Sequence, residues 1–153
     1  MKIGVLYFTR TGNSERIAGK ISEKLGCQKA RITDDVSWKG IIGWFRGGFY
    51  SIKGRRTNVS IEGNPVVSAF DKLVLVLPLW AGNTAPAGYS FLQDSIKDIK
   101  DLYVVICNDG SEIDAAFLKL EQTVGEIKNK YGITKKTGNE DEVVAKLVKD
   151  ING

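Results

Sequence analysis

The chain has 153 residues, of which 42% are hydrophobic and 26% charged, and its formal net charge is +4 with an isoelectric point near 9.0. This composition excludes a disordered chain and is typical of one globular domain, which we expect to span residues 1–153. The sequence has no histidine, which argues against zinc chemistry and serine–histidine hydrolysis, and we assign no catalytic residue or metal ligand. No apolar run approaches the roughly 18 residues of a membrane span, and no secretory signal precedes the first strand, so we expect a cytoplasmic protein.

The first predicted element is a strand over residues 3–8, rich in β-branched and aromatic residues. It is followed by a helix whose apolar residues Ile17, Ala18, Ile21 and Leu25 recur at helical spacing. Between them lies the segment Thr9–Ser14, which contains three hydroxyl residues and Gly12. Because a helix N-terminus presents free N–H groups and partial positive charge, we expect an anion here, and phosphate first. The same residue types also serve simply as helix caps, so the loop alone does not show that an anion binds there.

The remaining elements alternate along the chain. We predict strands at residues 28–32, 73–77, 102–107 and 132–136 and helices at residues 87–99 and 115–130, with a final helix that Asn139 caps in a capping box with Glu142. The continuous apolar strands indicate burial on both faces. The alternation predicts an α/β fold: a doubly wound five-stranded parallel sheet, in the order 2-1-3-4-5, with helices on both faces.

In such a sheet, ligands bind beyond the carboxyl ends of the central strands. The loops expected at that edge are Thr9–Ser14, Pro78–Thr84 and Asn108–Glu112. Trp80 is either a lid over the core or a stacking platform for a flat ring. The third loop offers backbone N–H groups for the polar edge of a heterocycle. Together a phosphate-binding loop, an aromatic wall and a polar rim indicate a pocket for flavin mononucleotide (FMN).

The chain resembles the flavodoxin family over nearly its whole length. Thr9-Arg10-Thr11-Gly12-Asn13-Ser14 is similar to the family's phosphate loop, Trp80-Ala81-Gly82 to the aromatic loop beside the flavin, and Cys107-Asn108-Asp109-Gly110-Ser111 to the third flavin loop. The resemblance implies a short-chain FMN-binding one-electron carrier, in which Trp80 flanks the ring, Thr9, Thr11, Asn13 and Ser14 hold the phosphate, and Arg10 and Gly12 shape the loop. The candidate cofactor-binding residues are Thr9, Arg10, Thr11, Gly12, Asn13, Ser14, Pro78, Leu79, Trp80, Ala81, Gly82, Asn108, Asp109, Gly110 and Ser111.

Two departures from the family pattern bear on function. Residues 108–114 contain no aromatic side chain to cover the second flavin face, and the chain is basic where the family is usually acidic. The open face leaves an alternative, an FMN-dependent NAD(P)H or quinone oxidoreductase on the same fold. A nucleic-acid-binding module without flavin is the third hypothesis, but no recognised motif accompanies the charge, so we expect no nucleic acid partner. We expect redox proteins as partners and a monomer, since the fold does not require a dimer.

Residues 38–56 combine aromatic, aliphatic and basic side chains. Trp38, Ile41, Ile42, Phe45, Phe49 and Ile52 fall at helical spacing, and four glycines weaken the helix. The first interpretation is a helix of the fold packed on the sheet. The others are a docking surface for an acidic redox partner or a cap over the flavin edge, and a membrane-surface helix. The exposure of the aromatic residues distinguishes these interpretations.

Overall fold

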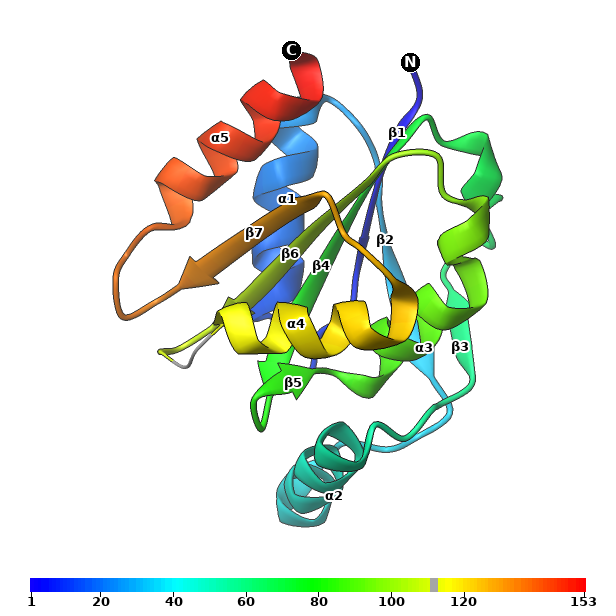
Figure 1. Ribbon diagram of the computed structural model, residues 1–153, viewed down its shortest axis with the longest axis vertical. Coiled ribbons are helices and arrows are strands. Elements are labelled where there is room, and N and C mark those ends of the chain that lie inside the picture. The colour runs from blue at the N-terminus through cyan, green and yellow to red at the C-terminus, as the bar shows by residue number, and fades with distance from the viewer. Residues whose placement is uncertain (111–112) are drawn as a thin grey trace.

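A mostly parallel sheet forms the centre of the molecule (Figure 1). The computed structural model describes residues 1–110 and 113–153, so Ser111 of the third loop lies outside the described residues. The strands are β1 (Ile3–Tyr7), β2 (Lys29–Asp34), β3 (Val59–Ile61), β4 (Lys72–Trp80), β5 (Asn83–Thr84), β6 (Leu102–Asn108) and β7 (Asn129–Thr134). The helices are α1 (Asn13–Leu25), α2 (Gly40–Lys53), α3 (Pro86–Ser95), α4 (Ile113–Val124) and α5 (Glu140–Asn152), with 3₁₀ turns at Val67–Ala69 and Ile96–Asp98.

The strand order confirms the predicted topology. The five parallel strands lie in the order β2-β1-β4-β6-β7, which is the order 2-1-3-4-5 expected from the sequence. Two short antiparallel strands were not predicted: β3 pairs with β2 at one edge, and β5 folds back on the end of β4. They have three and two residues, which is too short for an alternating pattern to reveal.

Helices cover both faces of the sheet, with α1 and α5 on one side and α3 and α4 on the other (Figure 1). Strand β4 shows why its sequence is continuously apolar. Leu73, Leu75 and Leu77 belong to the core under α3 and α4, whereas Val74 and Val76 belong to the core under α1 and α5. Each of these five side chains is at most 1% exposed. A strand covered on both faces has no position for a polar residue.

The α4–β7 boundary differs from the prediction of a helix over residues 115–130. Helix α4 ends at Val124, and Gly125 follows in the left-handed conformation, with φ at +89°. Ile127 is buried in the connection, and Tyr131 is buried in β7. Both residues matched the helical spacing only by coincidence, because a connection and a strand also bury apolar side chains.

Asn139 occupies the N-cap position of α5 but does not form the predicted capping box. Its side chain makes no capping hydrogen bond to the helix. Instead its Oδ1 accepts from the backbone N–H of Thr134 at 2.8 Å, and its Nδ2 donates to the carbonyl of Gly132 at 3.0 Å. Asn139 therefore connects the end of β7 to the start of α5.

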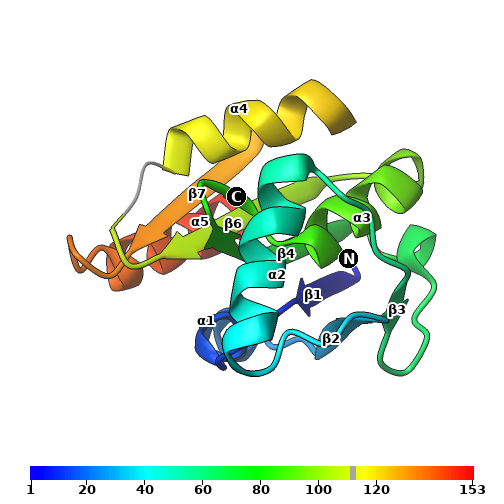
Figure 2. The same cartoon turned by 90° about the horizontal axis from the view of Figure 1, so that it is seen from below.

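Helix α2 does not cover a face of the sheet, contrary to the first interpretation of this segment. It lies beyond the carboxyl ends of the strands, on the same edge as the three predicted loops (Figures 1 and 2). The residues it buries are Gly43, Gly47 and Ser51, whereas its apolar stripe faces solvent. The glycines allow the helix backbone to approach closely, so that a Cβ on Gly43 would lie 2.1 Å from the carbonyl carbon of Trp38.

None of the helices in residues 1–110 and 113–153 has the length and hydrophobicity needed to cross a lipid bilayer.

Candidate functional site

The loops that follow β1, β4 and β6 line one cavity of about 700 Å³ at the carboxyl edge of the sheet. The structure brings nine of the candidate residues to this cavity: Thr11, Asn13, Pro78, Leu79, Trp80, Ala81, Gly82, Asn108 and Asp109. Thr9, Arg10, Gly12, Ser14 and Gly110 do not line it. The cavity volume lies within the range of cofactor sites.

The loop between β1 and α1 is shaped for an anion. Thr9 is buried, and its Oγ1 accepts from the backbone N–H of Gly12 at 2.8 Å. Gly12 is the N-cap of α1 with φ at +98°, and a Cβ built there would have no atom within 4 Å. Among the described residues no side chain caps the helix, so the N–H groups of its first turn have no side-chain acceptor there.

Two residues of this loop point elsewhere. The side chain of Ser14 is buried, and its Oγ lies 3.2 Å from Sγ of Cys107. The guanidinium of Arg10 donates to the carbonyl of Trp38 at 2.9 Å and to that of Gly40 at 3.3 Å. Arg10 thus anchors the segment that leads into α2, and Ser14 can reach an anion only through its backbone N–H.

Trp80 belongs to an aromatic cluster that packs against α2. Its ring centroid lies 5.6 Å from that of Phe8 and 5.3 Å from that of Trp38, both in edge-to-face arrangements. On the α2 side, a Cβ on Gly47 would lie 3.1 Å from Cε3 of the indole. The indole is therefore fixed in orientation, and it remains part of the cavity wall.

The turn after Trp80 is a two-residue hairpin loop. Ala81 and Gly82 connect β4 to β5 with φ values of +47° and +78°. Positive φ at both central residues is the geometry of a type I′ turn, which costs energy at an alanine. The Nζ of Lys119, from α4, donates to the carbonyl of Gly82 at 3.5 Å. This bond holds the rim of the cavity against α4.

The third loop is held by the end of the neighbouring strand. The N–H of Lys135 donates to the carbonyl of Asn108 at 3.0 Å, and that of Lys136 to the carbonyl of Asp109 at 3.1 Å. Gly110 is exposed beside the side chain of Lys136. Asn108 and Asp109 line the same cavity as Trp80 and Ala81.

Neither a family model nor a curated protein matches the sequence. Solved structures do match. A flavoprotein in complex with FMN from Lactobacillus acidophilus NCFM has a TM-score of 0.73 at 14% identity, with 93% of this chain and 97% of that chain covered. A putative flavoprotein from Bacteroides eggerthii has a TM-score of 0.76 at 21% identity, covering 98% and 96%. A flavodoxin bound to flavin mononucleotide from Fusobacterium nucleatum has a TM-score of 0.58 at 10% identity, covering 99% and 96%.

The chain has the flavodoxin fold. In this flavodoxin-like chain the cavity is also lined by Cys107 of the third-loop motif and by residues that the sequence analysis missed: Arg16, Ile17, Ile133, Thr134, Lys135, Gly138 and Glu140. Arg16 lies one helical turn after Asn13, so its position on the same face of α1 was readable from the spacing. The residues from β7 and α5 reach the cavity only through packing of distant segments, for which the sequence gives no signal.

Arg16 and Glu140 form the main charge pair at the cavity. Their side chains pair at 2.6 Å, and Arg16 also donates to Oδ1 of Asn13 at 3.1 Å. Lys20 pairs with Glu140 at 3.1 Å. The hydrogen bond from Arg16, supported by Lys20, lowers the pKa of Glu140 to about 2. Arg16 is thus a cation beside the α1 N-terminus whose charge is balanced by a carboxylate rather than free.

A second cavity, of about 650 Å³, lies between α2 and the end of β4. It shares Leu79, Trp80 and Ala81 with the first cavity. Its other lining residues come from Arg10 and α2: Gly43, Trp44, Phe45, Gly47, Gly48, Phe49 and Ile52. This cavity is mainly apolar, so it suits an uncharged or aromatic ligand better than a phosphate.

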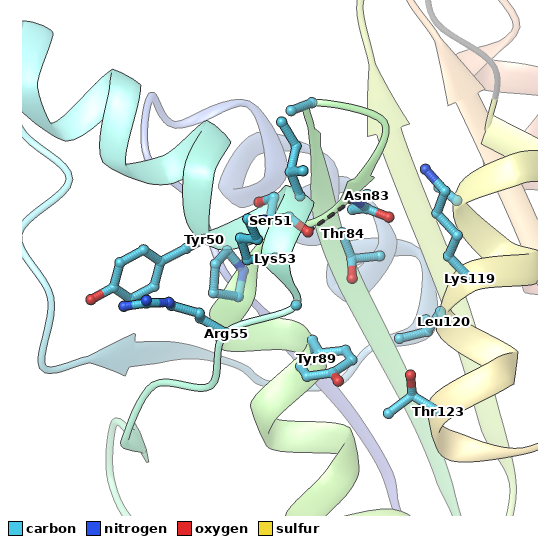
Figure 3. Close-up of a pocket in the computed structure, with 15 residues that line it drawn as sticks. Tyr50, Ser51, Lys53, Arg55, Asn83, Thr84, Tyr89, Lys119, Leu120 and Thr123 are labelled. Atoms are coloured by element: carbon cyan, nitrogen blue, oxygen red, sulfur yellow. Dashed lines mark hydrogen bonds between the residues drawn. The ribbon is translucent and has the colours of Figure 1, made fainter.

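A smaller cavity of about 330 Å³ lies on the other side of the β4–β5 hairpin (Figure 3). Asn83 crosses it, donating to the carbonyl of Ser51 at 2.9 Å. Its cations do not converge. The guanidinium of Arg55 lies over the ring of Tyr50 at 5.6 Å, whereas Lys119 reaches the carbonyl of Gly82 at 3.5 Å. This arrangement fixes the hairpin and α2 in place and does not form an anion site.

Proposed function

We propose that this protein binds FMN in the 700 Å³ cavity and carries single electrons between redox proteins. The observation that supports this most directly is the geometry of the cavity. The uncapped N-terminus of α1 lies at one end, and the indole of Trp80 and the loop of Asn108 and Asp109 form its walls. The flavodoxin-fold neighbours from Lactobacillus and Fusobacterium were crystallised with FMN.

The residues of the chain have separate tasks in this proposal. The first N–H groups of α1 bind the phosphate, with the hydroxyl of Thr11 and the amide of Asn13 beside them. Trp80 flanks the ring, and the Asn108–Asp109 backbone contacts its polar edge. FMN, when bound, supplies the one-electron chemistry, and the protein orients it and excludes water from one side. The chain acts as a monomer in the cytoplasm, where its two cysteines, both free in the structure, remain reduced.

The experiment is a binding titration with FMN and with riboflavin, which lacks the phosphate. We expect FMN to bind at least tenfold more tightly than riboflavin, because only FMN uses the helix N-terminus. Gly12→Ala places a methyl group on the loop and should weaken FMN binding by about tenfold without changing riboflavin binding. A protein that takes up neither flavin would refute the proposal.

Gly26→Ala is the matched control. Gly26 ends the same helix with φ at +60°, and a Cβ there would also have no atom within 4 Å. Both substitutions strain a left-handed glycine at an end of α1, but only Gly12 adjoins the cavity loop. Equal FMN affinities for the two variants would place the phosphate elsewhere.

The second cavity favours one alternative, an FMN-dependent NAD(P)H or quinone oxidoreductase. It is apolar, it shares Trp80 with the proposed flavin site, and it has room for a second planar molecule. One of the solved structures with this fold is a flavodoxin, WrbA-like protein from Agrobacterium tumefaciens. Steady turnover of NAD(P)H with a quinone by the isolated protein would establish this role, whereas a carrier needs a separate reductase.

A further inference from the structure

The outward side of α2 carries a continuous set of large apolar side chains, which we call the α2 apolar face. Its members and their exposed fractions are Ile41 (77%), Ile42 (75%), Trp44 (62%), Phe45 (65%), Phe49 (47%) and Ile52 (66%). The only other large apolar side chains this exposed in the described part of the chain are Met1, Val66 and Leu118, which are scattered over distant segments. Exposed apolar residues that gather on one helix mark a surface with a partner.

The orientation of α2 is fixed by its opposite side. Gly43, Gly47 and Ser51 lie four residues apart and form the buried stripe, and Gly43 and Gly47 pack against Trp38 and Trp80. A rotation that buried the apolar face would lose these close contacts. Figure 2 shows α2 in front of the strand ends. The side chains of the apolar face are nevertheless accessible from outside, each being at least 47% exposed.

The charged residues of the segment that contains α2 have one sign. From Val36 to Ile61 the sequence contains no aspartate or glutamate and five cations: Lys39, Arg46, Lys53, Arg55 and Arg56. Arg56 pairs with Asp94. Within residues 1–110 and 113–153, the salt bridges involve none of the other four cations. No described carboxylate neutralises their charge, although Arg46 donates to the carbonyl of Ser37 at 3.2 Å and Arg55 lies over the rings of Phe49 and Tyr50.

We propose that α2 is an interfacial helix that binds this protein reversibly to the surface of an anionic lipid bilayer. The apolar face enters the boundary between headgroups and acyl chains, and Lys39, Arg46, Lys53 and Arg55 contact lipid phosphates. A helix with tryptophan, phenylalanine and isoleucine beside basic residues has the composition of such helices. A second copy of the chain is a poorer occupant, because two of these basic segments would repel one another.

Membrane binding in this orientation has a consequence for the second cavity. Trp44, Phe45, Phe49 and Ile52 belong to both the α2 apolar face and the cavity wall. Docking would therefore place the mouth of this apolar cavity at the level of the lipid headgroups. The membrane-binding proposal does not depend on FMN binding, and the two proposals are tested by separate experiments.

The test is cosedimentation with vesicles of phosphatidylcholine and phosphatidylglycerol in a 70:30 ratio, compared with vesicles of phosphatidylcholine alone. We expect binding to the anionic vesicles that weakens as salt rises, and at least tenfold weaker binding to the neutral ones. Trp44 supplies a second readout, because it is the most exposed of the three tryptophans and its emission should shift to shorter wavelength on binding.

Two variants separate the apolar and electrostatic contributions. Ile41→Gln with Ile42→Gln should lower the binding constant by about tenfold or more, since both side chains enter the bilayer boundary. Lys39→Gln with Lys53→Gln should lower it by a similar factor on anionic vesicles only. All four residues lie outside the 700 Å³ and 650 Å³ cavities, and Lys53 lines only the 330 Å³ cavity. The matched controls are Val66→Gln with Leu118→Gln, at 66% and 63% exposure, and Lys24→Gln with Lys97→Gln; neither should change binding.

Failure to bind anionic vesicles at low salt would overturn the proposal. Equal loss of binding in the control variants would overturn it as well, because the contact would then not involve α2. Sedimentation of the free protein as a dimer that Ile41→Gln with Ile42→Gln converts to a monomer would assign the face to a second copy instead. Binding to an acidic protein but not to vesicles would assign it to a redox partner.

Discussion

The hydroxyl of Ser14 and the thiol of Cys107 form a buried polar contact between α1 and β6. The Sγ of Cys107 also donates to the carbonyl of Leu77 at 3.4 Å. Burial raises the pKa of the Cys107 thiol, so it stays protonated and able to donate. This contact explains why a serine in the candidate phosphate loop faces the core.

Ser14→Ala should therefore act on stability rather than on ligand binding. Removal of the hydroxyl leaves the thiol with one partner fewer, at a cost of about 1 kcal/mol in the free energy of unfolding. Urea unfolding measures this cost, and a flavin titration should show an affinity within about threefold of the unaltered chain. A large loss of FMN affinity at unchanged stability would instead put the hydroxyl on the phosphate.

At the scale of single residues, the sequence predicted the loop but not whether each of its side chains points toward the core or toward the cavity. A strand followed by Thr9–Ser14 and an amphipathic helix was enough to expect an anion-binding helix N-terminus. A hydroxyl in such a loop can also turn inward, as Thr9 does toward the N–H of Gly12. The choice depends on which buried donors and acceptors lie nearby, and those come from distant segments.

At the scale of elements, the packing of α2 depends on the absence of a side chain at one position. Gly43→Ala would push its Cβ into the backbone of Trp38, from which it would lie 2.1 Å. We expect a loss of roughly 2 kcal/mol or more in the free energy of unfolding, or release of α2 from the sheet edge. Urea unfolding and the near-ultraviolet circular dichroism of Trp38 and Trp80 report the two outcomes.

Gly48→Ala is the control for this prediction. Gly48 lies in the same helix, without positive φ, and a Cβ there would have no atom within 4 Å. Alanine should then raise the free energy of unfolding, by up to about 1 kcal/mol, because it is the better helix former. If both substitutions destabilise the chain equally, the close approach at Gly43 does not hold α2 in place.

The sequence predicted the existence of α2 but not its orientation. The hydrophobic period of Trp38–Ile52 favoured an inward apolar stripe, yet the small residues Gly43, Gly47 and Ser51 form the buried side. Their spacing of four was visible in the sequence. Periodicity alone does not show which of two stripes is buried, the one of large residues or the one of small residues. Close packing of the helix backbone at the small residues compensates for the apolar area that the large residues leave exposed.

The charge pair between α1 and α5 predicts an acid-sensitive step in stability. The pKa of Glu140 lies below its ordinary value, at about 2, so its pairing with Arg16 stabilises the fold fully above about pH 4.5. This contribution is lost as the pH falls toward 2. We expect Glu140→Gln to lower the free energy of unfolding by roughly 1 kcal/mol at pH 7, the upper range for exposed pairs, and to make no difference near pH 2. Urea unfolding between pH 2 and pH 7 measures both. A constant difference across this range would exclude the pair as its cause.

At the scale of the whole molecule, the net charge of +4 bears on the proposed flavin chemistry. A basic protein stabilises an anionic reduced flavin, so its reduction potential should exceed that of an acidic protein with the same fold. Lys135→Glu, at the cavity wall, should lower the potential by tens of millivolts, since two unit charges about 10 Å apart in water interact by about 0.4 kcal/mol. Lys97→Glu, outside the cavity, should change it less. Redox titration that ranks the two variants equally would contradict a local electrostatic effect.

The overall topology was the most predictable level. Alternating strands and helices, joined by right-handed crossovers, leave few arrangements of five parallel strands, and the observed order is the expected one. The strand Leu73–Leu77 was recognisable because burial on both faces excludes polar residues. What escaped prediction was short or set by tertiary packing: β3, β5, the end of α4 and the place of α2.

Strand β3 has a consequence for solubility at high concentration. It pairs with Ile32, Thr33 and Asp34 of β2 and so covers half of a six-residue strand that would otherwise end the sheet. The outermost strand on this side, β3, has three residues, whereas the strand at the opposite end of the strand order, β7, has six. Short edges offer a poor template for intermolecular strand pairing, the usual start of cross-β aggregation. If concentrated solutions of this protein do associate, the contact to examine first is the exposed isoleucines and aromatics of α2, and not the β3 edge of the sheet.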